Sequence, residues 1–376
     1  MTRWWNPYSR FVGPGFDGFW SEHLARPRKL LFIVGVGFDP RVLGPLQKIV
    51  AAKPNAERHC IAIDFQDGFT ADEAAGAFRD VNQTGLNALF PGGSLDVRRL
   101  EPNDQDGIRS VSRNTALMLG DVRSFSGYTD IVLDISSLPR IIYLTILNTL
   151  LTWLVDKDAE WPLGASTNLH VVYAEAAGID SRIQKKELEP DLAPIHNLSI
   201  RLDEEATEAW PTVWFPVLGE GNAEILARIA DHVVPEDVCP VLPAQTADPH
   251  RADNIMHEVG EQLFERFEVD PRDILYATED NPFQLYRSLL GAMQRYEESL
   301  ALVGGVRFVL SPLSSKGLSV GALLACFEKR LTGNQDQVRA GLAYVETRRY
   351  EAGSLSADDH GVPVSLWLAG ECYRMD

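Results

Sequence analysis

The chain has 376 residues, more than one hydrophobic core usually supports, and this length predicts two domains. Hydrophobic residues make up 45% and charged residues 23%, close to globular averages, which excludes wholesale disorder and a fibrous repeat. The formal net charge of −18 opposes attraction to a phosphate backbone, so we expect no broad nucleic-acid binding.

The first half of the chain alternates apolar strands with helices. Residues 29–36 form a continuous apolar run, typical of a strand buried on both faces. Further strands are expected at 59–65, 95–100, 130–135 and 169–173, and helices at 42–51, 72–90, 108–125 and 141–155. This alternation predicts a parallel sheet built from βαβ units.

The second half repeats the order of strand, glycine loop and helix at 213–218, 219–222 and 223–232. Its other strands are expected at 238–242, 306–310, 341–346 and 364–368, with helices at 250–267, 281–302 and 318–330. Residues 178–211 are charged and proline-punctuated, which predicts domains over 1–200 and 201–376, the second with a helical insertion. The predicted fold is therefore α/β, with two Rossmann-like domains whose mainly parallel sheets are flanked by helices.

The cysteines and the N-terminal residues bear on the compartment. Four cysteines are far apart and form no CxxC pair, which argues against a zinc knuckle or a disulfide framework: Cys60, Cys239, Cys326 and Cys372. The N-terminal residues contain no apolar segment typical of a signal peptide, and acidic residues bracket the apolar stretch 141–155. We expect a cytoplasmic protein with reduced cysteines and no membrane association.

Four polar loops follow predicted strands, two in each half. Doubly wound sheets bind ligands outside the carboxyl ends of their strands, where helix N-termini favour anions. The expected ligand-binding residues are Gly35, Gly37, Asp39, Arg41, Asp134, Ser136, Ser137, Arg140, Gly219, Gly221, Asn222, Ser314, Ser315, Lys316 and Gly317. The direct contacts are expected from Arg41, Ser137, Arg140, Ser315 and Lys316.

The first loop, 35–41, is open to two interpretations. Its glycines permit close approach of a ligand, Asp39 can accept from a hydroxyl, and Arg41 can pair with a phosphate. The motif is not GxGxxG, however, and the glycines and Pro40 can simply turn the chain while Asp39 and Arg41 are solvated.

The serine-containing loops are open to the same two interpretations. In 134–140 a carboxylate, two hydroxyls and a guanidinium lie between apolar elements, yet Ser136 and Ser137 can also cap the next helix. In 311–317 the hydroxyls, Lys316 and a helix start suit an anion, while the structural alternative is an N-cap serine beside a solvated lysine. Because this loop lacks the Walker A glycines, ATP hydrolysis of the P-loop kind is not expected.

The segment from Asp134 to Arg140 resembles the strand-4 motif of CARF domains, in which an aspartate or asparagine, a hydroxyl and a basic residue line a cyclic-oligonucleotide pocket. Residues 308–317 are similar to the variant with lysine as the basic residue, and 35–37 resemble the first-strand loop of that family. Two such halves in one chain resemble SAVED proteins. The match covers three short loops. In the strand-4 loop the chain departs from the family, because Ser-Ser and Leu-Pro replace the usual threonine-rich or Gly-Gly core.

The resemblance implies a sensor of a nucleotide-type small molecule, such as a cyclic oligonucleotide, in a bacterial antiviral defence system. No nuclease, protease or membrane module follows in the sequence, so the effector is expected to be a separate protein. A homo-oligomer is compatible with this role. The sequence names neither the ligand nor a cofactor.

Two alternatives remain open, an enzyme and a ligand-free scaffold subunit that binds partners through its acidic surface. Five residues can build a carboxylate-rich site for glycosyl, nucleotidyl or phosphoryl transfer with a divalent cation: Asp39, Asp64, Asp134, Glu175 and Lys316. HExxH, GxSxG and paired Cys-His motifs are absent, so the sequence names no catalytic residue and favours a binding protein over an enzyme without deciding between them. His250 and His257 share a helical face but lack a third ligand at metal spacing, so no metal site is expected.

Overall fold

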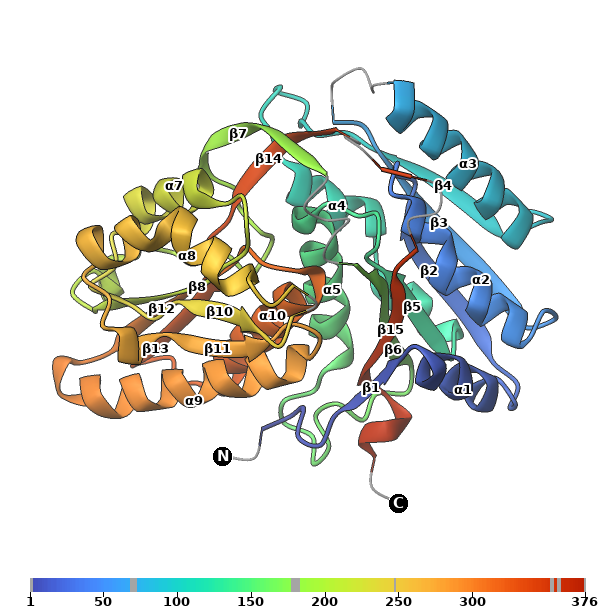
Figure 1. Ribbon diagram of the computed structural model, residues 1–376. Coiled ribbons are helices and arrows are strands. Elements are labelled where there is room, and N and C mark those ends of the chain that lie inside the picture. Colours follow the sequence, from blue (N-terminus) through green and yellow to red (C-terminus); the bar gives the residue numbers. More distant parts are fainter. Residues whose placement is uncertain are drawn as a thin grey trace. The chain divides into compact units, whose positions relative to one another are not determined.

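The computed structural model describes residues 3–67, 73–176, 183–246, 248–351, 355–356 and 360–374. The chain divides into two compact units, the first made of Met1–Lys186 with Arg349–Asp376 and the second of Glu187–Arg348. Each unit is an α/β layer structure in which helices cover a mainly parallel sheet (Figure 1). The predicted fold class is confirmed.

The first unit is built on a seven-stranded sheet with the order β1-β15-β6-β5-β2-β3-β4. Its strands are β1 (Ser9–Val12), β2 (Lys29–Gly35), β3 (Glu57–Phe65), β4 (Leu95–Leu100), β5 (Asp130–Asp134), β6 (Asn168–Glu175) and β15 (Val362–Ala369). Strands β2 to β6 pair in parallel, whereas β15 pairs antiparallel with both β6 and β1. The central strands β2 and β5 are buried along almost their whole length because both of their faces are covered.

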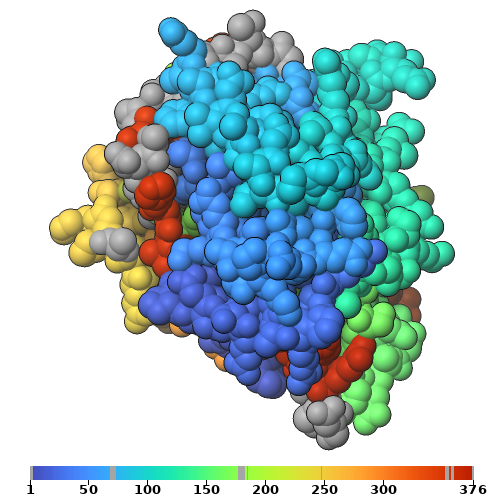
Figure 2. All heavy atoms as spheres, turned by 90° about the vertical axis from the view of Figure 1, so that its right-hand side faces the viewer, coloured from blue at the N-terminus to red at the C-terminus, as the bar shows by residue number. Residues whose placement is uncertain are grey.

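Helices lie on both faces of this sheet (Figure 1). On one face are α1 (Pro14–His23), α2 (Leu43–Ala52) and α3 (Glu73–Leu89), and on the other are α4 (Val111–Leu119) and α5 (Arg140–Leu154). The layer of α1, α2 and α3, coloured dark to light blue, forms much of the face shown in Figure 2. Beneath it Phe16 and Trp20 of α1 pack with Phe32 of β2 and Leu46 of α2 in one buried cluster.

The second unit is built on a sheet with the order β11-β10-β8-β12-β13, to which β9 adds by pairing with β8. Its strands are β8 (Thr212–Val217), β9 (Asp237–Val238), β10 (Val241–Ala244), β11 (Leu275–Thr278), β12 (Val306–Pro312) and β13 (Val338–Leu342), and all of their pairings are parallel. Helices α7 (Ala223–Val233) and α8 (Arg251–Glu261) cover one face. Helices α9 (Pro282–Leu300) and α10 (Lys316–Thr332) pack together on the other.

The two sheets share one topology. Each sheet contains five parallel strands that can be numbered 1 to 5 in chain order. These are β2 to β6 in the first unit and β8, β10, β11, β12 and β13 in the second. With this numbering, the strand order in both sheets is 3-2-1-4-5. This is the doubly wound Rossmann order, which reverses between the first and fourth strands. The reversal lies between β2 and β5 in the first unit and between β8 and β12 in the second.

The division of the chain differs from the predicted domains 1–200 and 201–376. Strand β15 was expected to close the second half, but it lies between β1 and β6 of the first sheet. The expected strand 341–346 covers the end of β13 and the start of a further strand, β14 (Val345–Glu351). Strand β14 pairs with β7 (Gln184–Leu192), and these two strands form a separate sheet. Such pairings between distant segments leave no local signal in a sequence, so the prediction followed chain order instead.

Among the described residues, the helices are too short or too polar for any of them to cross a bilayer.

Candidate functional site

The two predicted loops of the first unit contact each other at the carboxyl edge of its sheet. Ser137 Oγ, from the loop after β5, donates a hydrogen bond of 2.8 Å to the carbonyl of Gly35 at the end of β2. A Cβ atom at Gly35 would lie 2.7 Å from Ser137 Oγ, and one at Gly37 would lie 3.0 Å from the Ser137 carbonyl oxygen. Both glycines therefore allow close approach of the neighbouring loop.

Asp39 and Arg41 form a buried ion pair within the first loop. Arg41 donates from its backbone N and Nε to Asp39 Oδ1 at 3.0 and 2.9 Å, and from Nη2 to Oδ2 at 2.6 Å. Asn82 of α3 donates to the carbonyls of Gly37 and Asp39 at 2.7 and 2.9 Å. Because both charged side chains are buried, the alternative in which they are solvated is wrong.

The loop after β5 holds its polar groups in place without capping the next helix. Asp134 Oδ1 accepts from the Ser136 backbone N at 2.7 Å, and Ser136 Oγ accepts from the Ala174 backbone N at 3.2 Å. Helix α5 begins after Pro139 with no side-chain cap. The serines therefore bind neighbouring backbone rather than the helix start, and Arg140 is the first residue of α5.

The glycine loop of the second unit is tied to the loop after β12 in a similar way. The buried Asn222 side chain donates from Nδ2 to the carbonyls of Gly219, Glu220 and Leu313, each at 2.9 Å. A Cβ at Gly219 would lie 2.7 Å from the Leu313 carbonyl oxygen. Gly221 has a φ of +68°, a conformation that glycine adopts most readily.

The loop 314–317 provides the start of α10. Ser315 is its N-cap, since Ser315 Oγ accepts from the Leu318 backbone N at 3.3 Å, so the capping interpretation is confirmed for this residue. Lys316 is the first helical residue and is partly buried, while Ser314 and Gly317 are buried. In each unit the structure thus brings the two predicted loops together at the point where the strand order reverses.

The residues of the enzyme alternative come from both units, Lys316 from the second and the four carboxylates from the first. Asp39 is paired with Arg41, and Asp64 accepts from both Arg79 and Gln66. Within the described part of the chain, these carboxylates belong to no cluster with metal-ligand spacing.

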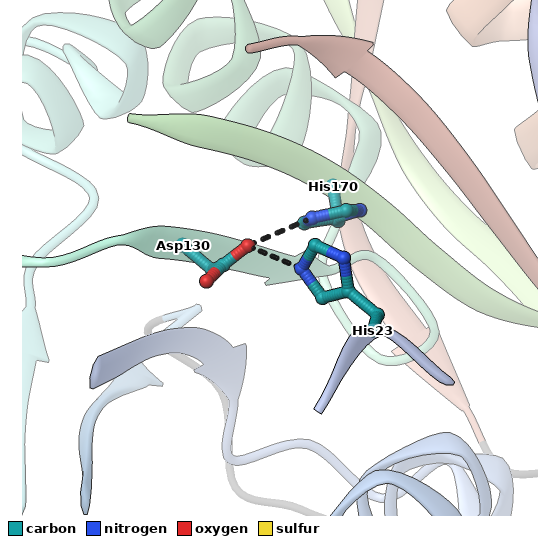
Figure 3. Close-up of side chains that lie close together, drawn as sticks. All are labelled: His23, Asp130 and His170. Carbon is teal, nitrogen blue, oxygen red and sulfur yellow. Dashed lines mark hydrogen bonds and ion pairs between the residues drawn. The ribbon is translucent and has the colours of Figure 1, made fainter. Parts of the chain in front are cut away.

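A group that the sequence analysis missed lies at the opposite, amino edge of the first sheet. His23 ends α1, Asp130 begins β5, and His170 lies near the start of β6 (Figure 3). Both imidazole rings point to the same oxygen, with Nε2 to Asp130 Oδ1 distances of 2.7 Å for His23 and 3.2 Å for His170. All three side chains are buried.

Further polar side chains contact the carboxylate oxygens of Asp130. Thr129 Oγ1 donates to Asp130 Oδ2 at 2.6 Å, and Asn168 Nδ2 donates to Oδ1 at 2.9 Å. Arg28 Nη1 lies 3.9 Å from Oδ2 and donates to Glu371 through Nη1 and Nη2 at 2.5 and 2.9 Å. The carboxylate is therefore enclosed by donors on all sides.

Aromatic rings surround His170, and burial together with the hydrogen bonds inside the group determines the pKa values of His170 and Asp130. The rings of Phe19, Trp20 and Trp367 lie within 6 Å of His170, centre to centre. Burial lowers the pKa of His170 against the opposing effect of Asp130. Burial would by itself raise the pKa of Asp130, but the hydrogen bonds with His170 and His23 outweigh it and hold that pKa well below its usual value.

The sequence carried only part of the signal for this group. Val132 of β5 lies beside His170 in the parallel register, so Asp130 and His170 share one face of the sheet. Polar residues within apolar strands were the available clue. The third member, His23, lies on a helix that the sequence analysis did not predict, and the expected exposed pair His250 and His257 takes no part in any metal-type cluster of the described residues.

Comparisons with known proteins give no family. No family model matches the chain, and neither does any curated protein. Among solved structures, a Pseudomonas aeruginosa protein described as a universal stress protein is similar, with 11% identity and a TM-score of 0.23 over 85% of this chain and 95% of that one. A TM-score this low supports no inference about fold or function.

Proposed function

We propose that this chain is a sensor that binds a nucleotide-type small molecule at the carboxyl edges of its sheets and acts with a separate effector protein. The observation that carries the proposal is the position of the predicted loops. In each unit they follow the two strands between which the order reverses, β2 and β5 or β8 and β12. Doubly wound sheets bind their ligands at this point.

The charges at two helix starts support an anionic ligand. Arg140 is the first residue of α5 and Lys316 the first of α10, and neither helix has an acidic residue in its first turn. A helix N-terminus already carries partial positive charge, so a cation there disfavours the helix by roughly 0.3–1 kcal/mol. The same arrangement occurs in both units, and a bound phosphate would turn this cost into a favourable interaction.

The remaining predicted residues fit a supporting role in this site. The Asp39–Arg41 pair and the Asn222 side chain fix the loops, and the glycines let the loops pack closely. The loop-level resemblance to CARF and SAVED proteins makes a cyclic oligonucleotide the first ligand to test, and it is the basis for proposing a defence role and an effector on another chain.

The test is a thermal-shift panel of mononucleotides, dinucleotide cofactors and cyclic oligonucleotides on the full chain. A ligand present at 100 times its Kd should stabilise the folded state by about 2.7 kcal/mol. Arg140→Ala and Lys316→Ala should reduce that shift. Arg26→Ala and Lys157→Ala, which remove exposed charges before β2 and β6 at the amino edge, should leave it unchanged.

Two results would overturn the proposal. One is the absence of a shift with every nucleotide, as the scaffold alternative expects. The other is a ligand that stabilises the parent, Arg140→Ala and Lys316→Ala equally, because its site would then lie away from both helix starts. Turnover of the ligand, followed by chromatography, would favour the enzyme alternative instead.

A further inference from the structure

We propose that His23, Asp130 and His170 bind one divalent transition-metal ion of the zinc type. Their ligand atoms, two imidazole Nε2 atoms and one carboxylate Oδ1, all lie within 4.8 Å of one another. Two histidines and one carboxylate are a ligand set that zinc takes in proteins. The site lies at the amino edge of the first sheet and is independent of the proposed ligand sites at the carboxyl edges.

Two of the three spacings, those from each histidine to Asp130, can be compared with the geometry of a tetrahedral ion. Bonds of about 2.0–2.1 Å place neighbouring ligands of such an ion roughly 3.3 Å apart. The His170 Nε2 to Asp130 Oδ1 distance is 3.2 Å, and the His23 distance of 2.7 Å needs to open by roughly 0.6 Å.

The number of donors around Asp130 Oδ1 also favours an ion. Without one, His23, His170 and Asn168 must all donate to this single oxygen. A carboxylate oxygen has about two lone-pair positions, so three N–H donors exceed what it accepts well. An ion bound to both imidazoles and to Oδ1 replaces two of those hydrogen bonds and leaves Asn168 as a donor to the same oxygen.

The surroundings are those of a supported metal ligand. Thr129 and Asn168 fix the orientation of the carboxylate, and Arg28 is itself paired with Glu371, so the guanidinium charge beside Asp130 is balanced. Hydrogen-bonded outer groups of this kind orient metal ligands. The aromatic rings around His170 keep the group apart from bulk water.

The burial of the group indicates a structural role for the ion. The exposed fraction is 7% for His23 and 0% for both Asp130 and His170, so the group has little contact with bulk solvent. The three ligands come from α1, β5 and β6. The ion would therefore hold α1 against the sheet, and its binding would stabilise the first unit.

The test uses the full chain, stripped with a chelator and titrated with Co²⁺. The expected result is one equivalent of bound Co²⁺, lost on addition of Zn²⁺, with the visible absorption bands of a four-coordinate site in which a water completes the three protein ligands. His23→Gln retains an amide that can donate to Asp130, and it should bind at least tenfold more weakly, without the bands. The control is His250→Gln with His257→Gln, which removes an exposed histidine pair and should bind like the parent.

Absence of stoichiometric binding to the parent overturns the proposal, and so does a His23→Gln protein that binds as the parent does. If His23→Gln fails to fold, X-ray absorption of the zinc-loaded parent decides. Two imidazole ligands with the remaining ligands oxygen support the site, and any sulfur ligand overturns it. No nucleotide enters this experiment, so its failure leaves the proposed sensing function standing.

Discussion

Arg41 and Asp39 are two residues apart and joined by three hydrogen bonds, although both side chains are almost fully buried. The side-chain exposure is 0% for Arg41 and 6% for Asp39. A buried charge is tolerated only when it is paired and hydrogen-bonded, and this pair meets both conditions. The loop after β2 is therefore fixed by its own side chains, and Asn82 adds two further bonds to its carbonyls.

Replacing Asp39 should destabilise the first unit strongly. Asp39→Ala leaves the Arg41 guanidinium buried without its carboxylate, which should cost roughly 3–5 kcal/mol in the free energy of unfolding. The matched control is Asp17→Ala, which breaks the exposed pair with Lys48 and should cost less than about 1 kcal/mol. Urea denaturation of both variants checks the prediction, and equal effects would mean that Arg41 finds water or another partner.

The strands were predicted well where their signal is local. The parallel strands β2, β3 and β5 have buried centres, and each contains a short apolar run in the sequence. The loops at their ends could be located for the same reason. Which sheet β15 joins could not be predicted, because it depends on antiparallel pairing with β6, nearly two hundred residues earlier in the chain.

The candidate sites show the same limit. The positions of Ser137 and Asn222 after buried strands were predicted, but not their bonds to Gly35 and Leu313, which join loops from different strands. The group formed by His23, Asp130 and His170 was missed entirely, since its members meet only through packing of α1 on the sheet. Contacts between distant segments leave little trace in a single sequence.

A methyl group at Gly35 should separate the two loops of the first unit. In Gly35→Ala the new Cβ would lie 2.7 Å from Ser137 Oγ and 2.8 Å from Leu138 Cδ2, so these two side chains of the loop after β5 must shift. Overpacking of this kind costs roughly 1–3 kcal/mol and should also weaken ligand binding at this edge. Thermal denaturation with and without the nucleotide found in the panel measures both effects.

Gly44→Ala is the control for that substitution. Gly44 lies in α2, and a Cβ there meets nothing within 4 Å. Gly44 lies in the first turn of α2 and precedes Pro45, which limits the helix preference of alanine there, so the variant should change the free energy of unfolding by less than about 1 kcal/mol. A Gly35→Ala protein as stable as Gly44→Ala would show that the loop after β5 moves freely.

Three cysteines should be unreactive in the folded protein. Burial raises the pKa of Cys239 and Cys326 to about 12 and also raises that of Cys60. The reactive form is the thiolate, and at pH 8 a thiol whose pKa is raised in this way is almost entirely protonated. In a Cys372→Ser background, Ellman's reagent should label none of the three in native buffer and all three in denaturant. Fast labelling without denaturant would show that the cores open readily.

Substitutions at Ser315 and Lys316 should affect different quantities, the stability of the protein and its affinity for the ligand. Ser315→Ala removes the cap of α10 and should cost about 1 kcal/mol. Lys316→Ala removes a cation from the positive end of the same helix, so the helix dipole alone favours this variant by roughly 0.3–1 kcal/mol, while the proposed anionic ligand loses a contact.

Urea denaturation and a nucleotide titration of each variant measure the two quantities. The expected pattern is lower stability for Ser315→Ala and lower affinity for Lys316→Ala. Lower affinity without lower stability is the result that binding of an anion by Lys316 predicts. If Lys316→Ala loses as much stability as Ser315→Ala and binds nucleotide like the parent, the lysine is a structural residue and α10 is not part of a ligand site.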